Sequence, residues 1–208
     1  NYVNHLPENK YTVELIIMNR TPQYLGEKLK REVKIHYVPE RIKNPLGYNC
    51  RVNEIVKKGN YDILWCNFCT LSDITWLKAA KKYGIPVRIA HSHNSENMGN
   101  KLVLISHLQH KKIISKYVTH FFACSDVAGA FMFGDNIVKQ NNYCLINNAI
   151  ETDKYSYNEN IRMKTRLDLK ISDKIVITNV GRFHFLKNHS FLVNVFSEFY
   201  KKYPTSVL

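Results

Sequence analysis

The sequence predicts a doubly wound α/β fold, in which a parallel β-sheet carries helices on its two faces. Short apolar runs alternate with longer amphipathic stretches along most of the chain, and this alternation of strand and helix is typical of parallel strands covered by helices. The 208 residues are 45% apolar and 23% charged, which is a globular composition. This composition excludes a mainly disordered chain. Uninterrupted apolar runs stay far below the ~20 residues of a membrane-spanning helix, which excludes a spanning segment.

Seven apolar runs rich in β-branched and large side chains are predicted as strands. They cover residues 11–18, 33–38, 61–65, 87–90, 120–123, 143–146 and 175–180. Helices are predicted at residues 52–58, 71–83, 101–117, 126–133 and 188–203 from the spacing of their apolar residues. Leu102, Ile105 and Leu108 form an apolar stripe along the third of these helices.

A polar segment at residues 147–153 indicates a domain boundary, with residues 1–152 in a first domain and 153–208 in a second. Ser156 and Glu159 have the spacing of a capping box for a short helix at the start of the second domain. About 50 residues rarely sustain a core, so we expect this second domain to be incomplete. Because the chain begins at Asn1 rather than Met and ends like the start of a strand, we expect a fragment of a longer protein.

The chain has a net charge of +13, which favours anionic partners such as nucleic acid, anionic lipid or phosphorylated compounds. No glycine-aromatic signature of an RNA-binding module is found, so we expect no nucleic-acid partner. Lysine pairs such as Lys111 and Lys112 are interpreted as solvated helix faces. A basic first domain would also suit peripheral contact with an anionic membrane surface.

Five cysteines, an odd number in a chain of this size, favour a reduced intracellular protein over a disulfide scaffold. Cys66 and Cys69 follow a predicted strand with the C-x-x-C spacing of a redox motif. A zinc site would need a second close cysteine pair, which the sequence does not offer. Structural cysteines are the favoured interpretation, and a redox or zinc role is the alternative.

The segment 174–192 carries the strongest chemical signal. An apolar run leads to Gly181, Arg182 and Lys187 follow, and Asn188 is a candidate N-cap for the next helix. A loop between a parallel strand and a helix N-terminus is a common phosphate site, where Arg182 could bind oxygens bidentately and Lys187 could add a point charge. Leu186 and Asn188 replace the glycine and the Ser/Thr of a P-loop, which argues against a P-loop NTPase. A turn with two exposed cations is the alternative.

The stretch N-V-G-R-F-x-x-x-K-N-H-x-F-L within this segment resembles the donor-site opening of family 4 glycosyltransferases of GT-B fold, of the bacterial capsular and exopolysaccharide type. Three further stretches agree with that family in order, at residues 88–94, 122–126 and 146–151. The resemblance extends over nearly the whole chain. It implies an acceptor-side Rossmann-like first domain without its first strand, and the beginning of a nucleotide-sugar-binding second domain.

The resemblance also implies roles for individual residues. Arg182 and Lys187 would bind the diphosphate of a nucleotide-sugar donor, with Gly181 and Asn188 in the same substrate-binding loop. His91 would be the catalytic residue near the transferred sugar, and His93 a second substrate-binding residue. A hydrogen-bonded loop, or half of a metal site, is the alternative for this His-x-His pair.

The activity implied by the resemblance is a retaining hexosyl transfer, without cofactor or metal, from a nucleotide diphosphate sugar to a lipid-linked or saccharide acceptor. Such an enzyme would be cytoplasmic, with peripheral contact to the inner face of the membrane. The family's glycine-rich loop would precede Asn1 and its Glu-x7-Glu segment would follow Leu208, so the fragment alone is expected to be inactive. A nucleotide-sugar epimerase of the same fold and a non-catalytic basic binding module remain as alternatives.

Overall fold

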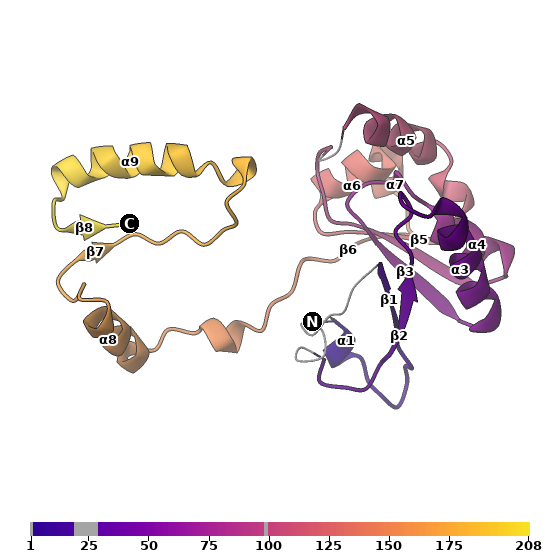
Figure 1. Ribbon diagram of the computed structural model, residues 1–208, viewed down its shortest axis with the longest axis horizontal. Coiled ribbons are helices and arrows are strands. Elements are labelled where there is room, and N and C mark those ends of the chain that lie inside the picture. The colour runs from indigo at the N-terminus through magenta and orange to yellow at the C-terminus, as the bar shows by residue number, and fades with distance from the viewer. Residues whose placement is uncertain (1, 19–28, 98–99) are drawn as a thin grey trace. The chain divides into compact units, whose positions relative to one another are not determined.

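The computed structural model describes residues 2–18, 29–97 and 100–208 (Figure 1). The chain divides into two compact units, Asn1–Ile150 and Glu151–Leu208, called unit 1 and unit 2 below. Each unit is described by itself.

Unit 1 is an α/β unit with only parallel strand pairs among its described residues. β1 (Glu14–Met18) pairs with β2 (Lys34–Val38) in a two-stranded sheet. A separate four-stranded sheet has the order β3-β4-β5-β6, with bounds Ile63–Phe68, Val87–Ser92, His120–Ala123 and Tyr143–Leu145. The predicted α/β fold with a parallel sheet flanked by helices is confirmed.

The connections between these strands carry the helices of unit 1. They are α1 (Tyr2–His5), α3 (Pro45–Lys58), α4 (Thr75–Lys82), α5 (Lys101–Lys111), the 3₁₀ helix η1 (Ile114–Lys116), α6 (Asp126–Phe133) and α7 (Asp135–Val138). α3 begins seven residues before the predicted start, because the Asn44 side chain accepts a hydrogen bond from the Gly47 amide and Pro45 occupies the first helical turn. The predicted helix 101–117 is shorter than expected, since it ends at Lys111 and η1 follows.

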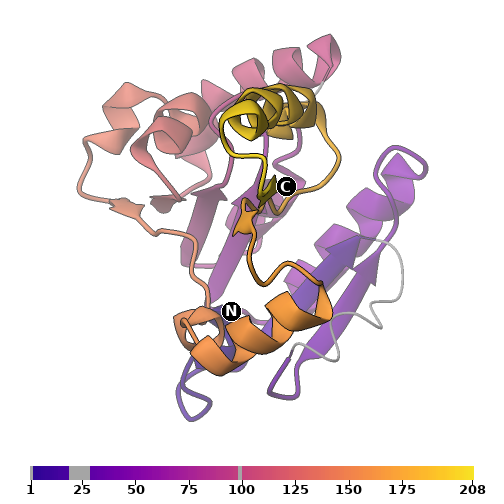
Figure 2. The same cartoon turned by 90° about the vertical axis from the view of Figure 1, so that its left-hand side faces the viewer.

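The core of unit 1 forms where helices cover the sheets. Leu64, Phe68 and Phe121 of the four-stranded sheet are buried together with Leu77 of α4 and Met132 of α6. α3 contributes Tyr48, Val52, Ile55 and Val56 to the same core. Figure 2 shows α3, in purple, alongside the β1–β2 ribbon. Burying these apolar side chains contributes on the order of 1.5–3 kcal/mol each to folding.

The apolar stripe of helix α5 faces solvent rather than the core. Leu102, Ile105 and Leu108 are exposed, whereas His107 is buried and stacks on Phe131 with ring centres 4.8 Å apart. The inward face is held by polar contacts: the Leu71 amide donates to His107 Nδ1 at 3.1 Å, and Lys111 Nζ donates to the Ala130 and Phe131 carbonyls. The prediction of a solvated Lys111 is therefore wrong, because this ammonium ties α5 to α6.

Unit 2 contains two helices, α8 (Glu159–Asp168) and α9 (His189–Lys202), and two short parallel strands, β7 (Ile175–Val176) and β8 (Ser206–Val207). The 3₁₀ helices η2 (Thr152–Tyr155) and η3 (Phe185–Lys187) complete it. Within residues 151–208, all described, Ser206 alone is buried. The unit therefore presents apolar side chains such as Ile161 and Leu167 to solvent.

Two local predictions for unit 2 need correction. Asn158, rather than Ser156, caps α8, because its side chain accepts a hydrogen bond from the Ile161 amide at 3.0 Å. The strand expected at residues 175–180 ends at Val176, because its ladder with β8 contains only two residue pairs. Asn188 caps α9 as predicted, in a left-handed conformation with φ 44°.

The two sheets of unit 1 approach each other through a polar cluster at the amino ends of their strands. Glu14 Oε2 accepts hydrogen bonds from the Tyr61 hydroxyl and His36 Nε2, both at 2.5 Å, and Glu14 Oε1 pairs with Lys34 Nζ at 3.1 Å. Burial raises the pKa of the Glu14 carboxyl, but these contacts outweigh burial and bring it down to about 2. The carboxylate thus links β1, β2 and the segment before β3.

This pKa predicts a stability loss in acid. A carboxyl with a native pKa of about 2 and an unfolded pKa near 4.5 stabilises the fold above pH 4.5, and this contribution disappears as the pH falls from 4.5 toward 2. We expect Glu14→Gln to lower the free energy of unfolding by about 1–2 kcal/mol at pH 7, and by much less at pH 2.5. Urea unfolding at both pH values measures this difference.

Glu159→Gln is the control, because the contacts of Glu159 with Arg162 and with the Tyr157 hydroxyl are both exposed. An equal loss of stability at pH 7 and pH 2.5 in Glu14→Gln would contradict the lowered pKa of the Glu14 carboxyl.

Candidate functional site

His91 lies at the carboxyl end of β4, as the sequence predicted, but its ring is covered rather than open to solvent. It is 1% exposed and lies beside Trp65, Phe122 and His93, with ring-centre distances of 5.7, 6.1 and 4.2 Å. Trp65 is in turn contacted by Tyr2 of α1 at 6.0 Å. An aromatic cluster therefore surrounds His91 on one face of the four-stranded sheet.

Within the described part of the chain, neither ring nitrogen of His91 makes a hydrogen bond of good geometry, although the Ile146 backbone lies close enough to favour the protonated ring. Burial lowers the pKa of His91 to about 4, and the neighbouring His93 adds to this effect while the Ile146 backbone opposes it. The imidazole is therefore neutral at pH 7. A buried polar group without a partner costs about 1–3 kcal/mol, which makes His91 a candidate to hydrogen-bond a ligand.

His93 is positioned by the neighbouring strand. Its amide donates to the Phe68 carbonyl at 2.9 Å, and its Nε2 lies 2.9 Å from Asn67 Oδ1. Both Asn67 and Phe68 belong to the carboxyl end of β3. The histidine pair is thus fixed from two adjacent strands, and the partner that holds His93 was missed from the sequence because Asn67 lies 26 positions away.

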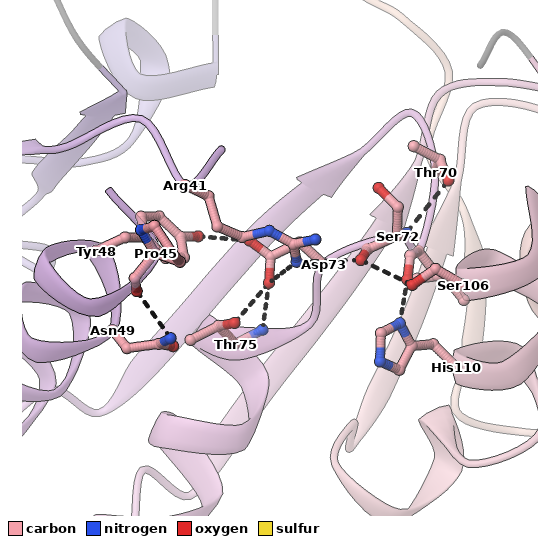
Figure 3. Close-up of polar contacts among 11 residues, drawn as sticks. Arg41, Pro45, Tyr48, Asn49, Thr70, Ser72, Asp73, Thr75, Ser106 and His110 are labelled. Atoms are coloured by element: carbon pink, nitrogen blue, oxygen red, sulfur yellow. Dashed lines mark hydrogen bonds and ion pairs between the residues drawn. The ribbon is translucent and has the colours of Figure 1, made fainter. Parts of the chain in front are cut away.

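A second polar group at the carboxyl ends of the strands was also missed from the sequence (Figure 3). Asp73 accepts hydrogen bonds from the Tyr48 hydroxyl at 2.7 Å and from Thr75 Oγ1 at 2.6 Å, and it pairs with Arg41 Nη1 at 3.2 Å. Burial raises the pKa of Asp73, but these hydrogen bonds outweigh burial and hold the pKa below its usual value. Asp73 therefore ties α3, the turn before it and the start of α4 together.

A cavity of about 420 Å³ lies beside the Asp73 group. Arg41 and Asp73 border it on the polar side, together with Ser72 and Ser106. Its remaining walls are Met18, Glu40, Ile42, Leu102 and Val103. The cavity therefore combines one guanidinium, two carboxylates and two hydroxyls with an apolar rim, which is a suitable lining for an amphipathic ligand.

The predicted phosphate loop lies in unit 2. A Cβ at Gly181 would lie 3.3 Å from Lys187 Cγ, so the lysine stem packs across the glycine. Asn188 Oδ1 accepts a hydrogen bond from the Phe191 amide at 3.3 Å, and His184 caps η3. Arg182 and Lys187 are both exposed. The structure thus brings Gly181, Lys187 and the start of α9 together, with two cations open to an anion.

The cysteine pair does not have the geometry of a redox motif. Cys66 lies inside β3, and α4 begins only at Thr75, so neither cysteine is at a helix N-terminus. Burial raises the pKa of the Cys66 thiol to about 12, which disfavours the reactive thiolate. Residues 2–18, 29–97 and 100–208 contain no group of three or more His, Cys, Asp or Glu able to hold a metal.

Comparison with known proteins gives one informative match. The chain is 27% identical over 204 residues to a protein of Bacillus subtilis (strain 168) named "Putative glycosyltransferase EpsF". The match covers 94% of this chain and 52% of that relative, so the chain spans about half the length of the curated relative. No family model matches the chain, and no solved structure matches it.

The environment of His91 predicts an unusual titration. In an NMR titration of the imidazole C–H signals, the His91 ring should change protonation near pH 4 and stay neutral at pH 7, because burial disfavours the cation. His91→Gln identifies its signal by its loss. A His91 midpoint above about 6 would show that the ring is solvated and would contradict the buried site.

The Asp73 group predicts a measurable stabilisation. Tyr48 is 1% exposed, so Tyr48→Phe should lower the free energy of unfolding by about 1–2 kcal/mol, since it removes a hydrogen bond to the half-buried Asp73 carboxylate. Tyr143→Phe is the matched control, because Tyr143 donates to Asp126 at an exposed position of the same unit. Equal losses of unfolding free energy in the two variants would show that the Tyr48–Asp73 hydrogen bond stabilises the fold no more than the exposed Tyr143–Asp126 hydrogen bond.

Proposed function

We propose that this chain is part of a glycosyltransferase that moves a hexose or N-acetylhexosamine from a nucleotide diphosphate sugar to a lipid-linked or saccharide acceptor, with retention, in capsular or exopolysaccharide synthesis. The observation that carries the proposal is the 27% identity, over 94% of the chain, to a protein named as a glycosyltransferase. The exposed Gly181–Lys187 loop supplies the matching chemistry. In this proposal the protein is a GT-B enzyme of family 4.

The loop of unit 2 would bind the donor diphosphate. Arg182 and Lys187 are exposed cations beside the N-terminus of α9, where the helix dipole and free backbone amides also favour an anion. During transfer, negative charge grows on the departing diphosphate. Cations fixed at that position stabilise the developing charge, which is electrostatic catalysis without a metal or a cofactor.

Unit 1 would hold the acceptor and His91. A neutral imidazole with unpartnered nitrogens can donate or accept a hydrogen bond at a sugar hydroxyl that reaches it. The aromatic rings around it limit water at that point. His93, held by Asn67, would position the same substrate.

The separate sheets of unit 1 fit the expectation of a missing first strand. Among the described residues, β1 pairs only with β2 and β3 pairs only with β4. In the full-length protein, we expect one additional parallel strand between β1 and β3, which would join the two sheets. Free strand edges of this kind are otherwise sites of unwanted pairing.

Charge reversal in the donor loop tests the proposal. In the full-length protein, Arg182→Glu or Lys187→Glu should weaken binding of uridine or guanosine diphosphate sugars by about 1.5–3 kcal/mol, which is roughly 10-fold to 150-fold in Kd. Isothermal titration calorimetry measures the change.

Lys164→Glu is the matched control for these variants, because Lys164 is an exposed cation on α8 of the same unit. Equal donor affinity in all three variants would show that this loop does not bind the donor. Binding of short RNA in preference to the nucleotide sugars would favour a basic binding module instead.

A further inference from the structure

The cavity beside Asp73 offers several hydrogen-bonding groups to a ligand. Arg41 Nη1 donates to the Ser72 carbonyl at 3.1 Å and pairs with Asp73 at 3.2 Å, and Nη2 is a second donor on the same group. The Ser106 hydroxyl donates to the same Ser72 carbonyl at 3.1 Å, so its oxygen can still accept a hydrogen bond. The Ser72 hydroxyl can both donate and accept. Figure 3 shows these three side chains, which all line the cavity.

The charges at this cavity are already balanced. Arg41 is paired with Asp73, and Lys43 Nζ pairs with Glu40 at 2.7 Å. A phosphate would have to compete with Asp73 for Arg41 and would also lie near the Glu40 carboxylate, which is unfavourable for an anion. A neutral ligand can use its hydroxyl groups here without breaking either ion pair.

The same cavity has apolar walls. Leu102 and Val103 come from the first turn of α5, Met18 ends β1, and Ile42 lies in the turn after β2. A sugar ring has an apolar C–H face bordered by hydroxyl groups, so it matches a lining of this mixed kind. The volume of about 420 Å³ also lies within the range of about 300–1,000 Å³ that is usual for small-molecule sites.

We infer that this cavity binds a sugar ring of the acceptor, and that unit 1 recognises the acceptor by this ring rather than by a lipid phosphate. Ring hydroxyls would hydrogen-bond to Ser72, Ser106 and Arg41, and the C–H face would lie against Leu102. The inference rests on the proposed function and narrows it, because that function includes acceptors of both kinds. The donor loop of unit 2 differs, since both of its cations are exposed and suit a diphosphate.

Ligand binding by the full-length protein tests this site. NMR titration with methyl glycosides of hexoses and N-acetylhexosamines gives a Kd for each glycoside, and geranyl phosphate is the lipid phosphate probe. Ser106→Ala should raise the Kd of the bound glycoside by about 3-fold to 10-fold, since it removes one hydrogen-bonding group. Ser106→Leu, which places a larger side chain in the cavity, should abolish glycoside binding.

The matched controls are Ser115→Ala and Ser115→Leu. Ser115 is exposed in η1 of the same unit and lies outside the cavity lining. Both control variants should bind the glycoside like the unchanged protein. Melting temperatures establish that each variant is folded, and the small Ser106→Ala change keeps the test decisive if Ser106→Leu does not fold.

A free saccharide and a lipid-linked saccharide present the same ring to the cavity. No helix in the described part of the chain has the length and apolar composition that crossing a bilayer requires. Octyl glycosides, used in solution, represent the lipid-linked source. Tighter binding of the octyl than of the methyl glycoside supports a lipid-linked sugar, and equal binding supports a free saccharide, provided that Ser106→Leu abolishes both.

Failure of every glycoside to bind would overturn the inference, with or without binding of geranyl phosphate. Glycoside binding that both Ser106 variants leave unchanged would also overturn it. Donor affinity is measured on the same samples: lost glycoside binding with intact donor affinity supports the sugar site. Unchanged donor affinity in Arg182→Glu and Lys187→Glu would instead contradict the donor loop of the proposed function, so the two failures are distinguishable.

Discussion

The parallel pairing of β3, β4, β5 and β6 is the constraint on which the rest of unit 1 depends. Parallel strands place all their carboxyl ends at one edge, so the segments that follow them must meet there. Asn67 at the end of β3 reaches His93 just after β4, and the segment after β3 brings Asp73 to Arg41 and Tyr48. Candidate binding groups from distant parts of the sequence thereby share one edge of the unit.

Buried polar groups at this edge divide into two kinds. Asp73 is surrounded by donors from three segments, so it keeps its charge and fixes the backbone around the cavity. His91 has neither of its nitrogens paired within the described residues, although it is more deeply buried than Asp73. The fully paired Asp73 is typical of a structural support. The unpaired His91 keeps hydrogen-bonding capacity that a substrate could use.

Unit 2 differs from unit 1, because its candidate binding residues are exposed and its apolar side chains are poorly buried. Its local geometry is nevertheless specific: Lys187 packs across Gly181, and Asn188 takes up a left-handed conformation to cap α9. These contacts lie within a few residues of one another. A short segment can therefore set the shape of the loop even where the unit has almost no buried interior.

Local features were determined by the sequence itself: α6 and β5 have the predicted bounds, and the cap at Asn188 forms as expected, because hydrophobic spacing and capping act over a few residues. The sequence also placed His91 at a strand end. It could not show the cavity beside Asp73, the aromatic cover of His91 or the exposed stripe of α5. Those features depend on which distant backbone and side-chain groups each element meets, and only the tertiary structure decides such contacts: α5 turns His107 inward because the Leu71 amide, 36 positions away, offers it a hydrogen bond.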